Sequence, residues 1–153
     1  MKNILFLFVV GAVVFAADQN GVDHWTSTQL KDYHKSLAPK ISSEKVATEN
    51  LAKYDNHLTM IAHREGDGVA EYHEKQADLF VVQSGTATLI TGGEVVEPKT
   101  ISAGEIRGKS IKGGTSKVLH PGDIVHIPAK TAHQTMVKSG TKFTYFVLKV
   151  DTK

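Results

Sequence analysis

The feature that most constrains this chain is a change in the spacing of its apolar residues near His57. From there onward, short runs alternate between apolar and polar side chains, which is the pattern of strands with one buried face. Glycine-containing turns separate the runs at residues 66–68, 84–85, 92–93, 113–114, 121–123 and 139–140. Many short strands joined in this way predict an antiparallel sandwich or barrel and not a parallel α/β sheet.

The expected strands cover residues 57–64, 70–74, 78–83, 87–91, 93–96, 116–119, 124–127, 134–137 and 141–150. Between two of them, residues 97–114 do not alternate cleanly, so we expect a long connection there. Long connections in compact domains often carry function. Arg107 and Lys109 in this segment suggest a flap that recognises an anion, and a solvated loop is the alternative.

The first sixteen residues have the pattern of a secretory signal peptide. Lys2 supplies the charged start, residues 4–15 are apolar apart from one glycine, and Ala16 is a small residue at the expected cleavage position. The apolar run is short for a bilayer span, so we expect no stable membrane insertion once the signal is removed. The protein is therefore expected to be exported, to a periplasm or to the extracellular space.

A helical segment is expected between the signal peptide and the strands. One helix is expected from about Ser27 to Leu37, and a second from about Ser42 to Tyr54. In the second, one helical face carries Val46, Leu51 and Tyr54. We therefore predict an N-terminal helical segment over residues 17–55 that packs on a barrel domain over residues 56–153.

The composition excludes several classes of function and several kinds of metal-binding or catalytic site. The formal net charge is +2, and without Lys2 it would be +1, with no block of lysine or arginine. Such a chain lacks the basic surface that nucleic-acid binding requires. It contains no cysteine, so disulfides, thiolate metal sites and a cysteine nucleophile are excluded. Any bound metal must be held by histidine, aspartate and glutamate.

Two of the expected strand regions carry such side chains at suggestive spacing. Glu71 and His73 are two residues apart and so project from the same face of a strand. Asp78 opens the next apolar run, and His133 follows a proline-containing turn about fifty residues later. Strands of a barrel bring residues this far apart in sequence to one point.

These segments resemble the two motifs of the cupin superfamily. In the first motif, Glu71-x-His73 is followed by a carboxylate at Asp78 and a closing glycine at Gly85. The second motif runs from Gly122 through Pro128 to His133. The resemblance implies an all-β fold, the double-stranded β-helix or cupin jelly roll, preceded here by one or two short helices.

The resemblance also implies a divalent metal held in the barrel by Glu71, His73, Asp78 and His133. Imidazole and carboxylate ligands suit Mn, Fe, Ni, Co or Zn, and the oxygen ligands disfavour copper. Three residues depart from the family pattern: Glu71 replaces a histidine, Asp78 is shorter than the usual glutamate, and Lys130 replaces a glycine.

Several roles stay open. Asp78 is either a ligand or an acceptor that orients a histidine. Glu71 is either the third ligand or a general base beside the metal. His63 either reaches the pocket, packs within the sheet or is exposed to solvent.

Three kinds of function fit this sequence. The first is a metal-dependent enzyme that acts on a small oxygenated molecule, of the isomerase, dioxygenase or decarboxylase type. The second is a binding module that holds a metal or a small ligand without turnover. The third is a structural or storage role through a dimer interface. A homodimer is expected because small barrels of this type leave strand edges to cover.

Overall fold

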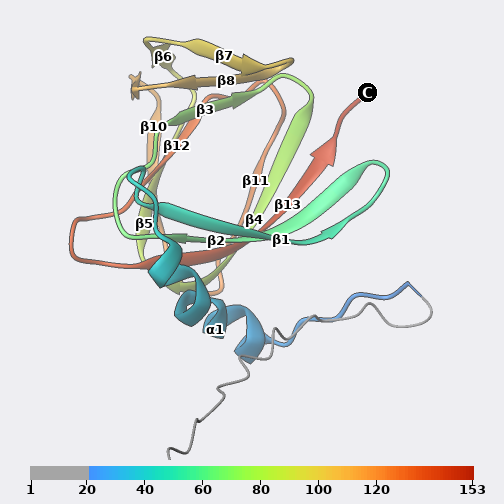
Figure 1. The fold of residues 1–153 in the computed structure, drawn as a ribbon. Coiled ribbons are helices and arrows are strands. Elements are labelled where there is room, and N and C mark those ends of the chain that lie inside the picture. Colours follow the sequence, from blue (N-terminus) through green and yellow to red (C-terminus); the bar gives the residue numbers. More distant parts are fainter. Residues whose placement is uncertain (1–20) are drawn as a thin grey trace, which may run out of the picture.

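The computed structural model describes residues 21–153, which form a helix followed by a two-sheet β-barrel (Figure 1). The predicted signal peptide, residues 1–16, lies outside the described residues. The helical elements are α1 (Ser27–Leu37) and a short 3-10 turn, Ala38–Lys40. The strands are β1 (Val46–Lys53), β2 (His57–Arg64), β3 (Ala70–His73), β4 (Gln76–Gly85), β5 (Ala87–Thr91), β6 (Glu94–Val96), β7 (Lys99–Ser102), β8 (Glu105–Gly108), β9 (Ser110–Lys112), β10 (Thr115–Leu119), β11 (Ile124–Ile127), β12 (His133–Met136) and β13 (Phe143–Asp151).

Two antiparallel sheets face each other across the barrel. One has the strand order β1-β2-β13-β4-β11, and the other has the order β10-β5-β12-β3-β8-β7. A small two-stranded sheet joins β6 and β9. The main core includes Phe80, Val82, Leu89, Phe143 and Val147, which are at most 3% exposed. The predicted all-β jelly roll with an N-terminal helix is confirmed.

The helix α1 packs on the outer face of the five-stranded sheet (Figure 1). It begins with a capping box, in which the Thr26 hydroxyl accepts from the Gln29 backbone N–H and the Gln29 side chain accepts from the Thr26 N–H. Such a cap contributes about 1 kcal/mol. Leu37 of the helix and Ile61 of β2 are fully buried in this contact, and each such side chain contributes roughly 1.5–3 kcal/mol. The first predicted helix is therefore confirmed.

The second predicted helix, from about Ser42 to Tyr54, is wrong. Most of this segment is β1, which pairs antiparallel with β2 along its whole length. Ala47 packs under the helix, whereas its neighbours Val46 and Thr48 line a cavity on the opposite face. The apolar residues therefore serve two faces of a strand, and their helical spacing is coincidental.

The expected long connection over residues 97–114 is wrong as well, because this segment forms β7, β8 and β9. These strands have three or four residues each, and every residue of β7 is exposed. A strand without a buried face has no reason to alternate in sequence. Among residues 21–153 the structure contains no helix long and apolar enough to cross a membrane.

Candidate metal centre

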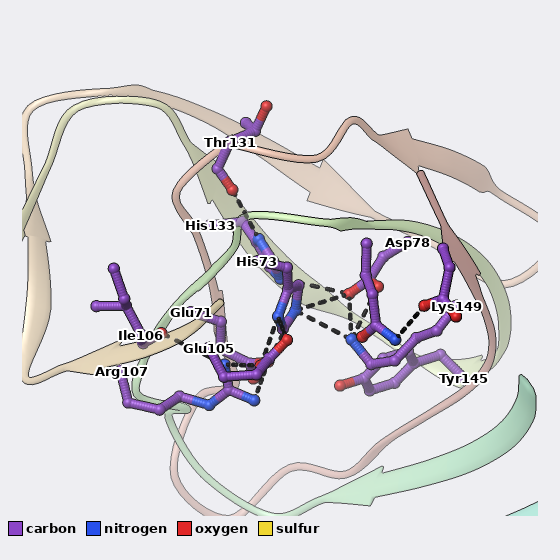
Figure 2. A network of polar contacts seen from close by, with 12 residues as sticks. Glu71, His73, Asp78, Glu105, Ile106, Arg107, Thr131, His133, Tyr145 and Lys149 are labelled. Atoms are coloured by element: carbon purple, nitrogen blue, oxygen red, sulfur yellow. Dashed lines mark hydrogen bonds and ion pairs between the residues drawn. The ribbon is translucent and has the colours of Figure 1, made fainter. Parts of the chain in front are cut away.

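Strand pairing brings the motif residues to one end of the barrel interior. Glu71 of β3 lies directly opposite His133 of β12. Asp78 enters from β4 in the facing sheet. One ligand atom each from Glu71, His73 and His133 lie within 4.8 Å of one another. Figure 2 shows these side chains pointing toward a common centre.

His73 is held by Glu105, a residue of the segment for which the sequence predicts a long connection. The two residues are opposite each other on β3 and β8, and Nδ1 lies 2.7–2.8 Å from both carboxylate oxygens of Glu105. Because a carboxylate only accepts, Nδ1 donates to it, which leaves Nε2 as the ring nitrogen that faces the centre. This Nε2 lies 3.3 Å from Asp78 Oδ2 and 3.7 Å from Glu71 Oε2.

His133 is oriented in the same way by a backbone carbonyl. Its Nδ1 lies 3.1 Å from the oxygen of Thr131 and donates to it. Its Nε2 is buried and has no hydrogen-bond partner among the described residues, although Asp78 Oδ2 is 3.6 Å away. A buried lone pair that faces a carboxylate is unfavourable unless a cation lies between them. The donor set therefore fits a divalent metal.

The two acids of the centre are ionised. Burial would raise the pKa of Glu71, but the charge of Arg107 and of the other nearby cations outweighs burial and lowers it below its ordinary value. Burial would likewise raise the pKa of Asp78, but the positive charge beside it, above all the Lys149 ammonium, holds that pKa far below its usual range. Both groups are therefore acceptors at neutral pH.

Charged groups surround the acids. Arg64 Nη2 donates to Glu71 at 3.2 Å, and Arg107 Nη2 lies 3.4 Å from the other oxygen of this carboxylate. Lys149 stands opposite Asp78 in the pairing of β13 with β4, and its ammonium lies 2.8 and 2.9 Å from the two Asp78 oxygens. The same ammonium donates to His73 Nε2 at 3.0 Å. A cation thus already contacts part of the donor set.

Arg64 lies inside the barrel because a glycine makes room for it. A Cβ added at Gly68 would come within 2.6 Å of the guanidinium Nη1. Arg64 also donates through Nε to the hydroxyl of Tyr145 at 3.0 Å. Burial raises the pKa of Tyr145, so its hydroxyl is neutral beside the acids.

A cavity of about 260 Å³ opens beside these groups. Its lining includes Glu71, Asp78, Arg64, Arg107, Tyr145 and Lys149. The sequence singled out Arg107 but not Arg64, Tyr145 or Lys149, and no local pattern marks these three. They enter the site only through the pairing of β2 and β13 with their neighbours.

His63, whose role the sequence leaves open, and Lys109, predicted for the flap, both lie outside the cavity. His63 is fully buried on the helix-facing side of β2, where Nδ1 lies 2.8 Å from the Thr144 hydroxyl. Lys109 is largely exposed and pairs with Glu97 at 3.7 Å. Neither lines the cavity. The part of the predicted flap that reaches the centre is Arg107.

The turn before His133 adopts a strained conformation. Lys130, at the position where the family pattern has glycine, has a φ of 63°. Its N–H donates to the His73 carbonyl at 2.7 Å, which ties the turn to β3. Glycine adopts this conformation without the Cβ clash, which explains the family preference.

Comparison with known proteins gives matches only at the level of structure. No family model matches the chain, and no curated protein matches it. An uncharacterised protein with a double-stranded β-helix domain from Klebsiella pneumoniae has a TM-score of 0.53 at 16% identity, covering 71% of this chain and 79% of its own. A cupin superfamily protein from Desulfitobacterium hafniense has a TM-score of 0.50 at 14% identity, with 71% and 80% covered.

One of the proteins with a similar structure is an enzyme, a lyase. The DMSP lyase DddQ from Ruegeria pomeroyi matches with a TM-score of 0.50 at 16% identity, over 69% of this chain and 47% of that one. At these identities the matches establish the fold and not the activity. The chain has the double-stranded β-helix fold, as the Klebsiella pneumoniae protein does.

Proposed function

We propose that this protein binds a divalent metal through His73, His133 and Glu71 and acts as an enzyme on a small oxygenated molecule in the adjacent cavity. Asp78 either completes the ligand set or orients the histidines. The observation that carries the proposal is the pair of buried Nε2 atoms, each freed by an acceptor on Nδ1 and both directed at carboxylates. Acceptors on Nδ1 orient metal-binding histidines in this way.

The types of ligand restrict the metal to a few divalent transition-metal ions. Two imidazoles with one or two carboxylates suit Mn, Fe, Ni, Co or Zn. When bound, such an ion polarises a carbonyl or carboxylate oxygen or activates dioxygen. We expect the site to leave positions open for substrate, as catalytic metal sites do.

The chain's own groups would hold the ligand set and orient the substrate. The lowered pKa of Glu71 keeps this carboxylate ionised at neutral pH, as a metal ligand must be. Arg64 and Arg107 hold its two oxygens, so the carboxylate keeps one orientation. Tyr145 presents a neutral hydroxyl to the same cavity and is positioned to donate a hydrogen bond to a substrate oxygen.

A second candidate function is metal or ligand binding without turnover. The observation that favours it is the pairing of Glu71 with two arginines. A carboxylate whose two oxygens are both held is better suited to act as a fixed ligand than as a base that must move. Similarity to a lyase supports the enzymatic alternative only through the shared fold.

Metal analysis of protein purified without a histidine tag tests the proposal. We expect about one equivalent of a divalent metal after dialysis, and loss of most of it in His133→Ala. His126→Ala, which alters an exposed histidine on β11, is the matched control and should keep the metal. Less than about a tenth of an equivalent in the unaltered protein, with no rebinding on dialysis against metal, would refute the proposal.

Turnover then separates the two candidate functions. The metal-loaded protein is tested against a panel of small organic acids, sugars and diketones, with His133→Ala as the metal-depleted control. Conversion that depends on His133 supports the enzyme. Full metal occupancy without conversion of any member of the panel favours the binding module.

A further inference from the structure

The cavity beside the metal centre has both apolar and charged lining residues. Its apolar residues include Val46, Met60, Ala62, Phe80 and Val147 of the five-stranded sheet. Its charged residues include Arg64, Arg107 and Lys149, which converge on the acids Glu71 and Asp78. An occupant that matches both sets of residues has a short apolar body and a polar or charged head.

The charges of the lining are balanced before any metal binds. Three cations face three acids, since Glu44 lines the cavity along with Glu71 and Asp78. A divalent ion would add two positive charges. Even if Glu105, which contacts Arg107 at 3.1 Å, is counted with the acids, one positive charge remains. An excess of positive charge in the lining favours an anionic ligand.

Two of the cations are placed to contact such a ligand. The side chains of Arg107 and Lys149 are 27% and 16% exposed, whereas Arg64 is 6% exposed. Arg107 pairs with Glu71 through Nη2 and with Glu105 through Nη1, and Lys149 pairs with Asp78 (Figure 2). A metal held by Glu71 and Asp78 would draw on the same carboxylate oxygens, so Arg107 Nη2 and the Lys149 ammonium would have N–H groups in need of an acceptor.

We propose that the cavity binds a small carboxylic acid with an apolar body, held by Arg107 and Lys149, and that this binding depends on the metal. The inference rests on the proposed metal centre and adds the chemical class of the ligand. A planar carboxylate matches the guanidinium fork and carries a single charge. A phosphate dianion fits less well, because the cations of the cavity are already paired with Glu71 and Asp78.

The two binding events are linked in this account. Lys149 donates to His73 Nε2 and to Asp78, so the ammonium and the metal compete for the same donors. With a metal held by these donors, the Lys149 ammonium would lose them as partners and would be free to donate to the carboxylate of the acid. Linkage is reciprocal, so the acid should also tighten metal binding.

Calorimetry with a matched pair of probes tests the inference. Isovalerate and isovaleramide have nearly the same shape and differ in charge. With zinc-loaded protein we expect isovalerate to bind at least about tenfold more tightly than isovaleramide, and at least about tenfold more tightly than it binds metal-free protein. Equal affinities for the acid and the amide, or tighter binding of inorganic phosphate, would overturn the proposal.

Variants distinguish recognition of the acid by Arg107 and Lys149 from simple coordination of the acid by the metal. At zinc occupancy verified by metal analysis, Arg107→Gln and Lys149→Met should each weaken isovalerate about tenfold. Lys109→Gln removes an exposed cation from the same region and should have no effect. Unchanged affinity in both Arg107→Gln and Lys149→Met would overturn the role of these residues. Failure to load zinc at all would instead refute the metal centre, and it is detected before any acid is added.

Discussion

Two buried histidine sites lie on opposite faces of the same barrel, and only one of them has the properties of a metal centre. His63, under the helix, has partners at both ring nitrogens, the Thr144 hydroxyl at 2.8 Å and Glu65 at 3.4 Å. His133, inside the barrel, has a partner at Nδ1 and none at Nε2 among residues 21–153. Burial alone therefore does not distinguish a ligand from a packing residue, whereas an unsatisfied nitrogen that faces acids does.

The largest expected difference between the two sites is in metal affinity. His73→Gln removes a donor nitrogen from the inner site, and we expect affinity for zinc to fall by more than about a hundredfold, since even partners of ligands contribute 10- to 100-fold. His63→Gln makes the same substitution at the outer site and should leave affinity within about twofold. Competition with a chromogenic chelator measures both. Similar losses of zinc affinity in the two variants would mean that the inner site is not the metal centre.

The second largest expected difference is in the free energy of unfolding of the metal-free protein. Asp78→Asn weakens a buried ion pair with Lys149 inside the barrel, and we expect a loss of about 2–3 kcal/mol, near the lower end for a broken buried pair. Glu97→Gln breaks the exposed pair with Lys109 and should change stability by less than about 1 kcal/mol. Urea denaturation in the presence of a chelator gives both values. A loss below about 1 kcal/mol for Asp78→Asn would show that this pair adds little.

The outer site should be recognisable by its pH dependence. Burial is the main cause that lowers the pKa of His63, against the opposing effect of Glu65. Protonation therefore favours the unfolded chain, and stability should fall as the pH drops below the unfolded histidine value of about 6.5. His63→Gln should flatten this fall, measured as urea midpoints between pH 7.5 and 5.5. His126→Gln should not.

The inner acids behave differently on acidification. The pKa values of Glu71 and Asp78 are lowered, so their contribution to stability is complete above the ordinary carboxyl range and is lost only as the pH falls below about 4. The two sites should thus lose stability in separate pH ranges. If His63→Gln leaves the loss of stability between pH 7.5 and 5.5 unchanged, then this loss does not originate at the outer site.

The smallest expected effect concerns the turn that positions His133. Lys130→Gly relieves a left-handed conformation and should stabilise the protein by about 1 kcal/mol. Lys138→Gly, an exposed position without a positive φ, should give no gain. Thermal unfolding at matched pH measures the difference. Destabilisation by Lys130→Gly would show that its side chain has a role beyond backbone geometry.

The difference between the sites also shows what the sequence could predict. His73 and His133 were recognised because family spacing is local to each motif, and the strand pattern placed both inside a barrel. Glu105 and Lys149 were missed because they join the site only through pairing across strands, opposite His73 and Asp78. Such pairing leaves no trace in local spacing. His63 was assigned an open role because period alone does not tell which face of β2 points inward.

Anomalous X-ray scattering from crystals of zinc-loaded protein tests the central claim most directly. The account predicts one strong peak inside the barrel, with Nε2 of His73 and of His133 at about 2.0–2.1 Å. A carboxylate oxygen of Glu71 should complete the set at about 2.0–2.2 Å. No peak between these residues at full zinc loading, or a peak at His63 instead, would contradict it.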